Sequence, residues 1–164
     1  MGMERKQESF EEKLAFGKEG EHEVGEYFMQ RSYCILPLYQ FTDDIAPKIF
    51  TLSSTITSPD LFICGNNKYF WVEVKTKNRW IKYNGTLETG CNYRHYKEYC
   101  KISDETGMTL YLIFNHKKDD PTGFYYVDIK KRYHRIWDGK NIKTGKIISP
   151  EMALWLINDL TKIK

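Results

Sequence analysis

The clearest helical pattern of apolar positions lies near the start of the chain. From Ser9 to Arg31, apolar residues and Gly17 recur every three or four positions, which predicts a helix with one face on a core. Gly17 on this face would let the helix approach a sheet closely. Glu21 also lies on it, and a lone buried carboxylate costs several kcal/mol unless it is paired or binds a metal. Glu21 is therefore a candidate site residue, and the alternatives are a buried cationic partner or a solvent-exposed helix edge.

The segment from Pro59 to Lys77 has the pattern of a β-hairpin. Two runs rich in apolar, aromatic and β-branched residues flank a turn cluster of glycine, asparagine and lysine. Asp60, Glu73 and Lys75 interrupt these runs. Because side chains alternate along a strand, Glu73 and Lys75 share one face, and the turn can bring Asp60 back across from them. The hairpin therefore predicts a cluster of charged groups on an otherwise apolar sheet.

The rest of the chain predicts further strands and two more helices. We expect strands over 33–39, 108–114 and 123–129, an Asn-Gly hairpin over 81–87, helices over 92–106 and from Pro150 to about Leu160, and an irregular loop over 41–58. The core elements then follow the order helix, strand, strand, strand, helix, strand.

Size and composition set limits on the class of protein. A chain of 164 residues with 41% apolar residues is expected to form one ordered domain, and a net charge of +3 permits a polyanionic partner without requiring one. The four cysteines lack CxxC spacing, so no zinc site is indicated. No stretch approaches the roughly 20 apolar residues of a membrane span, and the charged N-terminus lacks a signal-peptide core. The expected location is the cytoplasm, without membrane contact.

Pro59-Asp60 followed by Glu73-Val74-Lys75 resembles the signature of the PD-(D/E)xK nuclease superfamily. The first helix, with Gly17-x-x-Gly20-Glu21, also resembles the first helix of many members, in which a glutamate joins the metal site, and it is most similar to resolvase-like members. The resemblance implies a single α/β nuclease-like domain over 1–164. Its restriction-endonuclease-like core would be a mixed four- to five-stranded sheet flanked by helices in αβββαβ order.

The resemblance further implies a Mg²⁺-dependent DNA endonuclease, of resolvase-like or phage type, in which Mn²⁺ can substitute. Asp60 and Glu73 would bind the metal together with the main-chain carbonyl of Val74. Glu21 would bind it directly, through water, or at a second metal. Lys75 would stabilise the developing anion or, with a depressed pKa, assist proton removal. The products would carry a 5′-phosphate and a 3′-hydroxyl.

Basic residues after the hairpin are candidates for contact with nucleic acid. Lys77, Arg79, Lys82 and Arg94 lie among aromatic residues, a mixture that can contact phosphates and stack on bases but is also common on solvated ribbons. The basic cluster over 130–135 has the same two interpretations.

Other interpretations of the chain remain open. The spacing of Glu73 and Lys75 also suits an ion pair on a solvated sheet face. A catalytically inactive nuclease-fold module that binds nucleic acid or a protein partner is the alternative function. DNA is the expected partner, RNA is not ruled out by any residue, and a homodimer is compatible with the small size. No GxxxxGK[ST] phosphate loop or GxSxG elbow occurs, and the four histidines are scattered.

Overall fold

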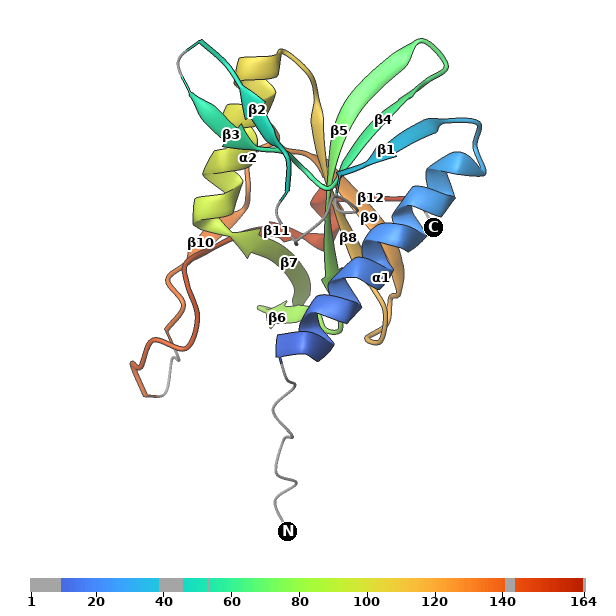
Figure 1. Ribbon diagram of the computed structural model, residues 1–164. Coiled ribbons are helices and arrows are strands. Elements are labelled where there is room, and N and C mark those ends of the chain that lie inside the picture. Colours follow the sequence, from blue (N-terminus) through green and yellow to red (C-terminus); the bar gives the residue numbers. More distant parts are fainter. Residues whose placement is uncertain (1–9, 39–45, 53, 141–143, 164) are drawn as a thin grey trace.

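The computed structural model describes residues 10–38, 46–52, 54–140 and 144–163. The chain forms a mixed α/β fold with a large mixed sheet and two α-helices (Figure 1). The elements are α1 (Phe10–Met29), β1 (Cys34–Pro37), β2 (Lys48–Phe50), β3 (Thr55–Thr57), β4 (Leu61–Gly65), β5 (Lys68–Lys77), β6 (Ile81–Tyr83), β7 (Thr86–Asn92), α2 (Tyr93–Thr106), β8 (Leu110–His116), β9 (Gly123–Asp128), β10 (Arg135–Trp137), β11 (Met152–Leu156), the 3₁₀ helix η3 (Ile157–Asp159) and β12 (Thr161–Lys162).

The main sheet has six strands in the order β1-β4-β5-β8-β9-β12, rather than the four to five expected. Among the described strands, β5 and β8 are the one pair that runs in parallel, because the chain crosses from one to the other through β6, β7 and α2. A second sheet has the order β10-β11-β7-β6, and β2 and β3 form a separate two-stranded sheet. The elements α1, β1, β4, β5, α2 and β8 occur in this sequence, but β2 and β3 separate β1 from β4, and β6 and β7 separate β5 from α2, so the expected αβββαβ succession is interrupted.

The main sheet separates two hydrophobic cores. On one face, Val24 of α1 packs with Val72 and Val74 of β5. On the other face, α2 and the second sheet pack against the same strands through residues such as Ile102 and Trp155. No helix among the described residues is long and apolar enough to cross a membrane.

The predicted hairpin is confirmed as β4 and β5. The strands pair from Leu61 opposite Val72 to Gly65 opposite Lys68. Asn66 and Asn67 both adopt positive φ, at 52° and 58°, as a tight two-residue turn requires. The alternation along β5 sends Val72 to the α1 core, whereas Glu73 faces α2.

The first helix is confirmed as α1, although Ser9, the first residue of the predicted pattern, lies outside the described residues. The glycine that allows close approach is Gly20 and not Gly17. A Cβ atom on Gly20 would overlap the Thr76 side chain of β5, whereas a Cβ atom on Gly17 would meet nothing within 4 Å. The second helix is confirmed with Asn92 as its N-cap and Gly107, in the left-handed region, as its C-cap.

Two expectations about secondary structure are wrong. The segment predicted as a last helix forms strand β11 and the short η3 turn. Its central residues Ala153, Leu154 and Trp155 are fully buried, because β11 lies between β10 and β7 and packs against the main core. A short apolar run of this kind fits a buried strand as well as a buried helix. The loop expected over 41–58 contains strands β2 and β3, while residues 39–45 lie outside the described residues.

Candidate functional site

The candidate site forms where β4 and β5 part. Strand β4 pairs only with residues 68–72 of β5, whereas β8 pairs with 71–77 on the other side. On the β4 side, residues 73–77 therefore pair with no described strand. Asp60, directly before β4, occupies this edge, and its Oδ2 accepts a hydrogen bond of 2.7 Å from the Val74 N–H. The divergence of the two strands thus places the Asp60 carboxylate beside the continuing strand.

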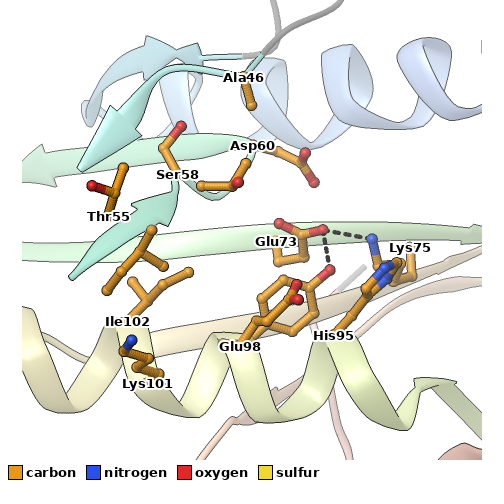
Figure 2. A pocket seen from close by; sticks show the side chains of 13 residues that line it. Ala46, Thr55, Ser58, Asp60, Glu73, Lys75, His95, Glu98, Lys101 and Ile102 are labelled. Atoms are coloured by element: carbon orange, nitrogen blue, oxygen red, sulfur yellow. Dashed lines mark hydrogen bonds and ion pairs between the residues drawn. The ribbon is translucent and has the colours of Figure 1, made fainter. Parts of the chain in front are cut away.

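Glu73 and Lys75 project from the same face of β5 toward α2. The Lys75 ammonium donates to Glu73 Oε1 at 2.5 Å, and the hydroxyl of Tyr99, on α2, donates to the same oxygen at 2.6 Å (Figure 2). The Glu73 side chain is only 8% exposed, so this is not the solvated surface ion pair that the spacing alone allowed. Two donors therefore fix one carboxylate oxygen of Glu73.

Electrostatics link four of the predicted residues. Burial raises the pKa of Asp60 well above its usual value, Glu73 and Glu21 raise it further, and Lys75 lowers it. The pKa of Glu21, on α1, is raised by burial and by Glu73 and is lowered by Lys75 and Lys18. The structure thus brings three carboxylates and one ammonium from three separate segments into mutual electrostatic contact.

Lys75 keeps its charge in this setting. Burial favours the neutral amine, but Glu73, Tyr99 and Asp60 together raise the pKa of Lys75 well above its ordinary value. The depressed pKa that proton removal by Lys75 requires is therefore absent. Of the two roles considered for this lysine, the arrangement fits stabilisation of an anion.

A cavity of about 580 Å³ opens over these groups. Asp60, Glu73 and Lys75 lie on one side of it, the β2–β3 hairpin with the residues next to it lines a second side, and α2 lines the third (Figure 2). The α2 side includes His95 and Glu98. Burial lowers the pKa of His95, and Lys75 lowers it further, which places the imidazole close to the charged cluster.

Sequence reasoning did not identify the contribution of α2. Tyr99 is buried on the inner face of α2, and its hydroxyl donates a hydrogen bond to Glu73. His95, four residues earlier, lies one helical turn away on the same side. This i, i+4 pair of polar aromatic residues on an inward face was the available signal.

The carboxylates of the charged cluster are candidate ligands for Mg²⁺. Among the described residues, no three Asp, Glu, His or Cys side chains form a ready-made group for a metal ion. The chemistry of the cluster nevertheless fits a hard cation, because carboxylate oxygens of Asp60, Glu73 and Glu21 outnumber the single ammonium of Lys75. Burial first, and then the charge of Glu73, raise the pKa values of Asp60 and Glu21, and a bound cation would favour the charged form of both carboxylates.

The four basic residues proposed for nucleic-acid contact do not gather at the cavity. The half-buried Lys77 faces the interior, where burial and then Lys75 lower its pKa to about 8. Its ammonium group forms no hydrogen bond or ion pair within the described part of the chain. Arg79 and Lys82 are exposed near β6, and neither lines the cavity. Arg94 is exposed on α2 beside His95, so it is the one of the four that lies next to a residue of the cavity wall.

The basic cluster over 130–135 is largely used within the protein. Arg135 makes two hydrogen bonds, of 3.0 and 2.7 Å, to Glu88, whose side chain is fully buried. Lys130 pairs with Asp104 at 3.0 Å. These contacts favour a structural role for this segment over a free patch for phosphates.

Comparisons with known proteins give a match among solved structures. No protein-family model matches the sequence, and the search of curated proteins gives no match. Among solved structures, the chain is similar to Hjc, a Holliday junction resolvase from the archaeal hyperthermophile Archaeoglobus fulgidus. The identity is 12%, the TM-score is 0.48, and the match covers 73% of this chain and 84% of that chain. At this level of similarity, no residue role is transferred from Hjc.

Proposed function

We propose that this protein is a metal-dependent nuclease that hydrolyses DNA phosphodiester bonds in a single domain. The supporting observation is that Asp60, Glu73 and Lys75 meet at the unpaired edge of β5 and line an open cavity, with Glu21 of α1 in electrostatic contact with Glu73 and Lys75. An ion pair of purely structural use would need only Glu73 and Lys75. It would not explain two further carboxylates, Asp60 and Glu21, held nearby at the cost of burial and of repulsion by Glu73.

Asp60 and Glu73 would hold Mg²⁺, with the carbonyl of Val74 and with Glu21 as further ligands. The bound ion would lower the pKa of a water molecule and neutralise charge on the phosphate, and Mn²⁺ would replace it. The Val74 N–H orients Asp60, and Tyr99 restrains Glu73, so both carboxylates are positioned by hydrogen bonds before substrate binds.

Lys75 supplies the positive charge of the site. Its raised pKa keeps it protonated at neutral pH, so its ammonium group can attract the substrate phosphate and stabilise the charge that develops on it. To meet a phosphate, the ammonium must share or leave its contact with Glu73 Oε1. A cation bound by Glu73 would favour that exchange by competing for the same oxygen.

The test is cleavage of supercoiled, linear and branched DNA, and of RNA, with Mg²⁺ or Mn²⁺. Asp60→Ala and Lys75→Ala are expected to lose activity by at least about a hundredfold. The matched controls, Asp138→Ala and Lys140→Ala, change an exposed acid and an exposed base that do not line the cavity. Both variants should cleave as the wild type does. Equal cleavage by all five proteins would indicate a contaminant and overturn the assignment.

A second candidate function is an inactive module that binds nucleic acid. The observation in its favour is that Glu73 Oε1 already accepts hydrogen bonds from Lys75 and Tyr99, so that this oxygen has two donors within the protein. Calorimetry with Mn²⁺ separates the two candidates. A live site binds the ion and loses it in Asp60→Ala, whereas the inactive module binds nucleic acid in a salt-sensitive manner without Mn²⁺ uptake.

A further inference from the structure

The β2–β3 hairpin is a structural unit of its own at the mouth of the cavity. It is hydrogen-bonded into neither larger sheet and stands beside α2, on the side of the molecule away from α1 (Figure 1). Thr55, Ile56, Thr57 and Ser58 line the cavity opposite α2. Because Ser58 is only two residues before Asp60, the hairpin is tied directly to the charged cluster.

The hairpin is anchored by one face only. Ile56 is 6% exposed and packs in the core with Ile49, its cross-strand partner. Alternation along the strands turns Lys48, Phe50 and the threonines away from this anchor. Phe50 pairs directly with Thr55, a cavity-lining residue, so the outward face of the hairpin is continuous with the cavity.

The tip of the hairpin presents apolar side chains to solvent. Phe50 is 78% exposed and Leu52 is fully exposed. The turn itself is held by hydrogen bonds, since the Thr51 N–H donates to the Ser54 carbonyl at 2.9 Å and the Ser54 N–H donates to Thr51 Oγ1 at 3.0 Å. These bonds join Thr51 to Ser54, yet the two large apolar residues beside them, Phe50 and Leu52, contribute little burial to the fold. Two neighbouring exposed apolar side chains beside a cavity make this tip a candidate contact surface.

We propose that this tip is a wedge that inserts Phe50 and Leu52 between bases of the nucleic acid next to the cleaved phosphate. The inference depends on the proposed function, because the occupant of the cavity determines what lies beside the hairpin. Leu52 lies two residues beyond Phe50, the cross-strand partner of Thr55, so the tip extends up to about 7 Å past the cavity wall. At about 3.4 Å per nucleotide, the tip reaches base steps within about two nucleotides of the cavity wall.

The chemistry of the same face matches a nucleic-acid partner. Lys48 donates to Thr57 Oγ1 at 2.7 Å, so its exposed ammonium group is held on the face that carries Phe50. Proteins that open base steps combine these groups. Cations and hydroxyl groups contact the phosphates, and an apolar wedge unstacks the bases. A purely apolar docking surface would not need the lysine.

The wedge implies a substrate class. Separating stacked bases costs least where the duplex is already unpaired or flexible, as at a bulge, a mismatch or a branch point. The preferred substrate is therefore DNA with such a step within about two nucleotides of the cleaved bond, in preference to a uniform duplex.

The test is binding and base unstacking without metal. DNA duplexes that carry 2-aminopurine beside a bulge, and uniform duplexes, are titrated in chelator with the wild type and with Phe50→Ala/Leu52→Ala. The control is Ile147→Ala/Ile148→Ala, which also removes two exposed apolar side chains, at 74% and 60% exposure. Wild type and control should unstack the probe and bind the bulged duplex about tenfold more tightly than the uniform one, and the tip variant should lose both effects.

Equal unstacking by the tip variant and the control overturns the wedge, and so does a wild type that leaves the probe stacked. Light scattering gives a further outcome. If the tip variant changes only the oligomeric state, the tip is a contact between copies of the chain and the proposal is wrong. Because the readout needs no cleavage, a wild type that unstacks the probe but never cuts DNA supports the wedge while contradicting the proposed function.

Discussion

The Tyr99 hydroxyl donates a hydrogen bond of 2.6 Å to Glu73 Oε1, the same oxygen that receives the Lys75 ammonium. Glu73 is on β5 and Tyr99 is on α2, so one bond ties the helix to the charged cluster. Burial, followed by Glu73, raises the pKa of Tyr99 far above its usual range, so the tyrosine remains a donor at every pH of interest. Tyr99 is therefore a positioning residue for Glu73.

Replacing Tyr99 with Phe should reduce kcat about tenfold while leaving KM nearly unchanged. The ring still fills its place, but Glu73 loses a donor worth about 1–3 kcal/mol and gains rotational freedom. Steady-state kinetics on a cleavable DNA measure kcat and KM, and the melting temperature of the variant protein shows whether its fold is retained. The matched control is Tyr69→Phe, because Tyr69 lies on β5, the strand of Glu73, and is 65% exposed. A large rise in KM without a fall in kcat would contradict the positioning role.

Replacing Asp60 with Asn should stabilise the metal-free protein at neutral pH while abolishing cleavage. The folded-state pKa of Asp60 is raised, so the folded protein loses stability as pH rises above the unfolded-state value near 4. Asn keeps an acceptor for the Val74 N–H and removes this charge. At pH 7 its melting temperature should rise by about 2–4 °C for each kcal/mol gained, and the gain should vanish at pH 3.

Two comparisons test this origin of the gain. Asp138→Asn should give no stabilisation, because hydrogen bonds from Lys140 lower the pKa of that exposed carboxylate. Added Mn²⁺ should raise the melting temperature of the wild type and not that of Asp60→Asn. A metal-free Asp60→Asn protein that is less stable than the wild type at pH 7 would show that the carboxylate is a net stabilising group.

The hairpin carrying Asp60, Glu73 and Lys75 could be predicted because its information is local. The run of β-branched residues, the Asn66-Asn67 turn and the period of two together determine both the pairing and the shared face of Glu73 and Lys75. Glu21 was identified for a similar reason, since a carboxylate on the inward stripe of a helix conflicts with its surroundings.

The remaining features depend on contacts between distant segments. Strand β11 could not be distinguished from a helix, because its burial by both neighbouring strands and the main core removes any periodicity. The role of Tyr99 requires α2 to pack across β5, which no local pattern encodes. Likewise, the inward orientation of Lys77 follows from the second sheet, whose topology the sequence did not reveal.

His116 should make the fold sensitive to mild acid. It is 1% exposed, its ring stacks on Trp80 with a centroid distance of 3.6 Å, and its Nε2 lies 3.1 Å from Thr89 Oγ1. Burial, with a smaller effect from Lys77, lowers its pKa to about 4. The folded state thus favours the neutral ring, and its contribution is complete above the unfolded-state value near 6.5 and is lost as pH falls toward 4.

The loss should approach about 3 kcal/mol at pH 4, from about 1.4 kcal/mol for each unit of pKa shift. Urea unfolding from pH 7 to pH 4 measures it, and His116→Gln should flatten the profile over this window. His22→Gln is the control, because that side chain is 61% exposed on α1. Parallel profiles for the wild type and His116→Gln would place the acid sensitivity elsewhere.

Gly20 should be intolerant of a side chain, unlike Gly17 three residues earlier on the same helix. Alanine at either position gains up to about 1 kcal/mol of helix propensity. At position 20 the new methyl group would overlap Thr76 of β5, and overpacking costs about 1–3 kcal/mol. Gly20→Ala should therefore be neutral or destabilising in urea unfolding, whereas Gly17→Ala should be stabilising.

Because Glu21 follows Gly20, displacement of α1 by Gly20→Ala should also lower cleavage. The double variant Gly20→Ala/Thr76→Ala should recover part of the stability and part of the cleavage. A stabilised, fully active Gly20→Ala protein would show that α1 does not need this close contact with β5 to place Glu21.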